Sequence, residues 1–238
     1  MKIKNLLLLV FSCVLLSSCF VKSLHPFYTK DTISFNKKLV GSWKDKGQGE
    51  WIIKSFKEEM FKEQKIKEKE GGIDITTTIT IEKPEPSSED FKLYQKYKDS
   101  YYVIYKKKGK ESVFVAVPFT LKNQLFLDFT PLFVESDDLS SLTENHLVPS
   151  HSLVKLDILE NGEISMRWLD ESKIENLFKE NKIKLKHEKT GFTGDDILLT
   201  ATSKELQKFI KKFMSSKDED KWTTDTDFIL NKVEDVKP

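Results

Sequence analysis

Cysteine is almost missing from this chain of 238 residues, and its two cysteines, Cys13 and Cys19, both stand close to the start. The sequence from residue 20 onward therefore has no thiol. A domain built from that stretch cannot form a disulfide, a thiolate zinc site or a cysteine nucleophile. Several classes of enzyme are excluded by this absence.

Arginine is equally scarce, and the charge has no dominant sign. Arg167 is the only arginine, and 39 basic residues against 38 acidic ones leave a net charge of +1. A site built on several arginine forks, such as a phosphate clamp, is excluded. Lysine and glutamate alternate through 57–70, whereas binding to nucleic acid requires a basic field. We therefore expect no nucleic-acid partner.

Apolar runs are short, and the longest lies at the N-terminus, from Leu6 to Leu16. It is well below the ~20 residues that span a bilayer. Two lysines precede it and small residues follow it, which is typical of a secretory signal. The ending Leu16-Ser17-Ser18-Cys19 resembles the lipobox of bacterial lipoproteins, in which the cysteine is lipidated and becomes the mature N-terminus. A plain secretory signal cut at Ser17 or Ser18 is the alternative.

The lipoprotein resemblance implies a place in the cell envelope. Lipoproteins of this type carry at least two acyl chains, enough for stable anchoring. Phe20, rather than an aspartate, follows Cys19, and in a cell with two membranes the resemblance then implies sorting to the outer one, facing the periplasm. We expect a signal peptide over 1–18, a lipidated tether over 19–40 whose aromatic residues dock on the body, and one β-rich domain over 41–238. The membrane is then a partner through the N-terminal lipid.

Alternating and β-branched segments predict an antiparallel β structure. Residues 73–81 alternate almost perfectly, as in a strand with one wet face. Short strands over 101–105, 112–119 and 125–129 are joined by polar turns, and Asn161-Gly162 predicts a two-residue hairpin turn in the second half. Strands joined by tight turns are typical of an antiparallel sheet or barrel.

Helices are predicted at three places. Asp170 or Ser172 caps one of them, since Ser172-x-x-Glu175 fits a capping box. Thr202-x-x-Glu205 starts a second, whose apolar residues repeat at i, i+3, i+4 and i+7 from Leu206. The composition of 57–69 favours a third helix. A hairpin arm that turns at Gly71-Gly72 is the alternative for that segment.

A short motif indicates the kind of β structure. Gly41-Ser42-Trp43 before a first strand at 50–53 resembles the lipocalin superfamily, where the tryptophan plugs the closed end of a small barrel. An aromatic residue packed on a strand end is the plainer interpretation of Trp43. We predict a mainly β fold, either an antiparallel meander or a lipocalin-like barrel, with two or three peripheral helices. The order of elements also resembles a group of uncharacterised envelope lipoproteins through 125–129, 147–151 and 198–207, and this brings no activity with it.

His151 and Asp128 are the candidate site for catalysis. A hydrolase would need them to converge in a cleft beside a nucleophile. The adjacent Ser150 and Ser152 point to the other face of a strand, and no Gly-x-Ser-x-Gly elbow is present. Asp128 interrupts an apolar strand, so it either faces solvent, makes a structural hydrogen bond, or marks a polar pocket.

Metal and cofactor chemistry have little support. His146 and His151 flank Pro149, so no helix presents them together, and we expect neither a metal nor a cofactor. The many phenylalanines supply a core or line an apolar ligand cavity. We predict a non-enzymatic module that binds an apolar small molecule or an envelope protein, with a hydrolase using His151 and Asp128 as the alternative.

Overall fold

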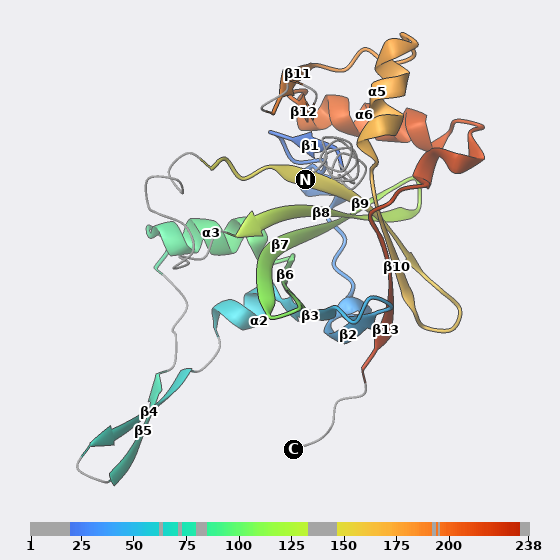
Figure 1. Ribbon diagram of the computed structural model, residues 1–238. Helices are drawn as coiled ribbons and strands as arrows, with labels where there is room; N and C mark the ends of the chain where they lie inside the picture. Colours follow the sequence, from blue (N-terminus) through green and yellow to red (C-terminus); the bar gives the residue numbers. More distant parts are fainter. Residues whose placement is uncertain are drawn as a thin grey trace, which may run out of the picture.

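Strands dominate the computed structural model, which describes residues 20–61, 64–70, 73–79, 85–132, 147–191, 194 and 196–233 (Figure 1). An 11-stranded sheet contains an 8-strand antiparallel barrel, and helices lie around it. The predicted mainly β fold, with a lipocalin-like barrel and peripheral helices, is confirmed.

The barrel closes because β9 pairs with both β8 and β10, while β13 joins β10 to β2. All neighbouring strands around the ring are antiparallel. In their order around the barrel the strands are β2 (Gly41–Asp45), β3 (Glu50–Ser55), β6 (Tyr101–Lys107), β7 (Lys110–Leu121), β8 (Gln124–Leu132), β9 (His151–Ile158), β10 (Ile164–Trp168) and β13 (Asp227–Lys232).

A short extension leaves the barrel at β9. Strand β1 (Lys22–Ser23) pairs with the start of β9 and runs parallel to β12 (Asp196–Leu199). Strand β11 (His187–Thr190) pairs with β12 and ends the sheet. The extension lies beside the helices that follow β10 in the chain (Figure 1).

The strands divide the apolar residues between two cores. In β8, Leu127 and Phe129 belong to the cluster inside the barrel, whereas Phe126 belongs to the cluster outside it. Alternation along a strand produces this division. The outer cluster is covered by α5 (Glu171–Lys179) and α6 (Ser203–Met214).

Both covering helices begin where the sequence predicts. Asp170 caps α5, and its carboxylate accepts from the backbone N–H groups of Ser172 and Lys173. Thr202 and Glu205 form the predicted capping box of α6. The remaining helical segments are α2 (Phe56–Met60), α3 (Glu89–Tyr97), η1 (Lys30–Thr32), η2 (Lys37–Leu39) and η3 (Glu219–Trp222).

Two local predictions are wrong. The helix favoured over 57–69 ends at Met60, and β4 (Gln64–Glu70) pairs instead with β5 (Ile73–Ile79) in a separate two-stranded sheet. Residues 73–79 are rich in β-branched side chains and form a strand that pairs with 64–70. This pairing outweighs the helix propensity of 64–70. The alternative of a hairpin arm therefore holds, with Gly71-Gly72 outside the described residues. The turn at Asn161-Gly162 is also longer than predicted, because Leu159 N–H donates to Glu163 O at 2.9 Å.

The N-terminal segment lies along the body. Residues 20–40, which we call the strap, include the fully buried Val21 and Phe27. Val21 N–H donates to Leu169 O at 2.9 Å. Farther along, Tyr101 Oη donates to Asn36 O at 2.9 Å. Burial raises the pKa of Tyr101 to about 12, which keeps this phenol protonated as a donor.

Candidate functional site

Asp128 and His151 meet on the outer face of the barrel. They stand on the neighbouring strands β8 and β9, whose register pairs Asp128 with Leu153. His151 Nδ1 lies 2.6 Å from Asp128 Oδ1 and 3.0 Å from Thr130 Oγ1. The two side chains that sequence reasoning selected are therefore in direct contact.

The strap closes over this pair. Phe27 N–H donates to Asp128 Oδ2 at 2.7 Å, so each carboxylate oxygen has a partner. The Asp128 side chain is 0% exposed and that of His151 is 13% exposed. Burial raises the pKa of Asp128, and the hydrogen bonds from His151 and Phe27 offset only part of that rise. Of the interpretations of Asp128, the structural hydrogen bond fits this geometry.

The pair lacks the other parts of a hydrolase site among the described residues. Both recorded contacts of the His151 ring are made by Nδ1, so Nε2 has no hydroxyl within hydrogen-bond distance in this part of the chain. Ser152 faces the barrel interior, where it accepts from Trp168 Nε1 at 3.2 Å. The Asp128 carboxylate is buried beneath the strap, so the Asp128–His151 pair connects the strap to the barrel.

Trp43 is a buried residue of β2. It is buried within the barrel cluster, and its Nε1 donates to Leu39 O in η2 at 3.0 Å. The ammonium of Lys232 lies 5.8 Å from the centre of its ring. The side chain therefore packs in the barrel cluster near the start of β2, and its one polar atom is satisfied.

Aromatic side chains fill the barrel interior. The ring of Trp51 lies 4.3 Å from that of Tyr105 and 5.0 Å from that of Phe228. Trp168 lies 5.3 Å from Phe129 and 5.6 Å from Phe228. Rings at these separations pack against one another and form part of the core inside the barrel.

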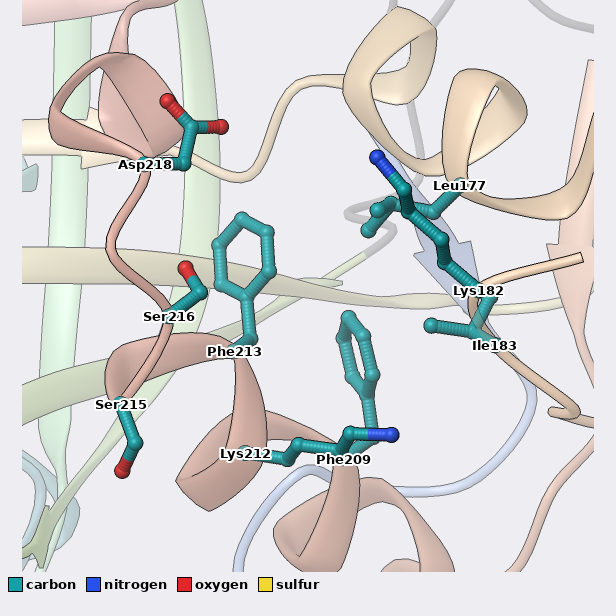
Figure 2. A pocket seen from close by; sticks show the side chains of 9 residues that line it. All are labelled: Leu177, Lys182, Ile183, Phe209, Lys212, Phe213, Ser215, Ser216 and Asp218. Atoms are coloured by element: carbon teal, nitrogen blue, oxygen red, sulfur yellow. The ribbon is translucent and has the colours of Figure 1, made fainter. Parts of the chain in front are cut away.

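A groove outside the barrel separates α6 from the segment that follows α5. Two adjoining hollows of about 490 and 510 Å³ share Lys182, Ile183, Phe209 and Lys212, and we call them together the α5–α6 groove. Figure 2 shows the rings of Phe209 and Phe213 pointing into the first hollow, opposite Leu177 and Ile183. The residues around both are Leu177, Asn181, Lys182, Ile183, Lys184, Leu185, Glu205, Lys208, Phe209, Lys212, Phe213, Ser215, Ser216 and Asp218.

Lysines dominate the polar rim of the α5–α6 groove. Lys182 pairs with Glu180 at 2.7 Å. Lys184, Lys208 and Lys212 make no ion pair within the described part of the chain. The residues that line the groove include four lysines but only two carboxylates, those of Glu205 and Asp218, so the lining carries excess positive charge.

Among the described residues, no three histidine, cysteine or acidic side chains gather as a metal site would require. Cys19 and His146 lie outside the described residues. No helix in the described ranges has the length and apolar character needed to cross a membrane. Comparisons with known protein families, curated proteins and solved structures found no match for this chain.

Sequence reasoning missed two features. The first is the hydrogen bond from Phe27 N–H to Asp128, which joins positions 101 residues apart and which no local sequence pattern predicts. The groove has a partial signal, because Lys208 and Lys212 flank the apolar stripe of α6 that was recognised. Its opposite wall, around Ile183, belongs to an irregular segment between α5 and β11.

Proposed function

We propose that this protein is a lipid-anchored, non-enzymatic binding module of the bacterial envelope. Its proposed location is the outer membrane, where it faces the periplasm. The observation that carries the binding role is the contrast between the two cores. Aromatic rings occupy the barrel interior, while an apolar groove with a lysine rim opens outside it. A pocket lined mainly by apolar side chains with a few polar groups is typical of a binding site.

Lipidation of Cys19 would hold the body close to the membrane. Phe20, the next residue, bridges to Asp170 and packs against Trp168 with ring centres 6.4 Å apart. The linker between the lipidated Cys19 and the folded body would then be very short, because Phe20 already contacts the body. Such an anchor would restrict the body's orientation as well as its location.

Metabolic labelling with palmitate tests the anchor. Wild-type protein should incorporate the label, and Cys19→Ala should not, because the thiol that receives the lipid is gone. Cys13→Ala is the matched control and should keep the label, since Cys13 lies within the apolar stretch of the leader. Label on Cys19→Ala, or its absence from wild type, would contradict the anchor.

The 2.6 Å contact between His151 and Asp128 is the one observation that favours a hydrolase as second candidate. That function predicts turnover of small esters or amides that His151→Gln abolishes. We expect no turnover by wild type, because strap and barrel seal the carboxylate and no nucleophile contacts Nε2 within the described residues. Turnover lost in His151→Gln would establish the alternative.

A further inference from the structure

We propose that the α5–α6 groove binds a single-chain amphiphile with an anionic head group, such as a long-chain fatty acid. The acyl chain lies over Phe209 and Phe213, and the head group contacts Lys208 and Lys212. This inference rests on the proposed binding role and gives that role a ligand class.

The floor of the groove suits an acyl chain. Phe209 and Phe213 stand one helical turn apart on α6, with ring centres separated by 5.5 Å. Leu177 and Ile183 face them across the first hollow (Figure 2) and are only partly buried. Phe209 and Phe213 are each 8% exposed, so a hydrocarbon chain would remove apolar surface from water mainly at Leu177 and Ile183, at roughly 25 cal/mol per Å².

The floor is held firmly enough to persist without a ligand. Phe213 packs against Trp222 at 5.7 Å, and Trp222 packs against Phe126 on the barrel at 5.9 Å. Gln207, on the same helix, donates to Thr32 Oγ1 in the strap at 3.0 Å. The groove is therefore pre-formed between fixed elements, which limits the entropy cost of binding.

The rim selects the head group. Lys208 and Lys212 stand one turn apart on α6, both exposed and without an ion pair in the described part of the chain. Lys184 adds a third unpaired ammonium beside the second hollow. A carboxylate or phosphate would gain charge-assisted hydrogen bonds here, whereas a neutral head group would not.

The size of the groove favours a small molecule. Each hollow measures about 500 Å³ (490 and 510 Å³), and they meet at Ile183 and Phe209. Pockets for small molecules measure roughly 300–1,000 Å³. One acyl chain therefore matches the space, while a protein surface would need a far larger contact area.

Photo-crosslinking tests the proposal on the full chain in phosphatidylcholine nanodiscs. The probe is palmitic acid with a diazirine near the end of its chain, and crosslinked peptides are identified by mass spectrometry. We expect crosslinks in 177–185 and 205–218, competed by unlabelled palmitate. The matched diazirine alcohol should label these peptides about tenfold less, because it lacks the charge.

Two double variants separate the groove from general charge effects. Lys208→Glu with Lys212→Glu should reduce crosslinking about fivefold to tenfold, through lost attraction and added repulsion. Lys204→Glu with Lys211→Glu makes the same charge change on α6 at residues that do not line the groove, and should leave crosslinking unchanged. Ile183→Ser should also reduce it, because Ile183 lines both hollows of the groove, and it is half-buried at the edge of the outer cluster.

The outcomes distinguish this proposal from the anchor. Equal labelling by acid and alcohol, or equal loss in both double variants, would overturn the anionic ligand. Absence of crosslinks in 177–185 and 205–218 would overturn the groove. Cys13→Ala, Cys19→Ala and wild type should all crosslink alike, so failed palmitate incorporation with intact crosslinking would contradict the anchor alone.

Discussion

Asp128 lies on the outer face of β8, yet solvent does not reach its carboxyl group. A buried carboxylate is costly unless every lone pair has a donor, and here His151 and Phe27 N–H supply the donors. The same three residues come from β8, β9 and the strap. One side chain thus ties the N-terminal segment to the barrel.

Replacing Asp128 should therefore destabilise the protein strongly. Asp128→Ala leaves the Phe27 N–H and the His151 ring without their acceptor in a buried place, which we expect to lower the free energy of unfolding by about 2–4 kcal/mol. The control is Asp196→Ala, which breaks an exposed pair with Lys22 at 3.8 Å and should cost less than about 1 kcal/mol. Urea unfolding measures both, and equal effects would refute the structural role of Asp128.

The titration of Asp128 supplies a second test at the same residue. Burial raises its pKa above the ordinary value of about 3.9. Folding therefore favours the protonated form of Asp128, so the additional stability that protonation supplies is present below about pH 3.9 and is lost as the pH rises through the raised pKa. The carboxyl carbon shift of Asp128, followed by NMR, should show a midpoint above 3.9. A midpoint below that value would mean that the hydrogen bonds outweigh burial.

At the scale of elements, prediction succeeded where the signal is local. The start of α6 follows from Thr202 and Glu205, whose side chains satisfy backbone groups within one turn. The start of α5 follows from Asp170 in the same way. The strands of the meander are predicted by the alternation of apolar and polar residues, because one face of each strand is buried and the other faces solvent.

Prediction failed where distant partners decide. Helix propensity favoured 57–69, but pairing with β5 gives the backbone of 64–70 its hydrogen bonds in a sheet. Helix α3 was not predicted at all, although Ser88 caps it by accepting from Phe91 N–H at 3.1 Å. Contact between Asp128 and His151 depends on the register of β8 against β9, which residue patterns alone do not determine.

The cap of α6 gives a prediction at this scale. Thr202→Ala removes the hydroxyl of the capping box and should cost about 1 kcal/mol of stability. Ser203→Ala, one residue later, changes a hydroxyl that is not the cap and should stay within about 0.5 kcal/mol of wild type. Thermal unfolding of the two variants measures the difference. Equal midpoints would show that the box contributes nothing.

Across the whole molecule, the barrel interior serves as a packed core, and the groove that we propose as the ligand site lies outside the barrel. The interior holds a core of packed aromatic and aliphatic side chains that includes Trp43 of β2. The outer face of β7, β8 and β9 carries a second core, and the groove opens at its edge between α6 and the segment after α5. We therefore place the proposed ligand site outside the barrel, in the α5–α6 groove.

The four tryptophans of this chain test that claim directly, since Trp43, Trp51 and Trp168 lie inside the barrel and Trp222 packs against Phe213 beside the groove. Fluorine-labelled tryptophan in the full chain gives each ring its own NMR signal during titration with palmitate. We predict that the Trp222 signal shifts in a saturable way while the three barrel signals stay in place. Saturable shifts of Trp43, Trp51 or Trp168 with an unmoved Trp222 would place the ligand inside the barrel and contradict the account.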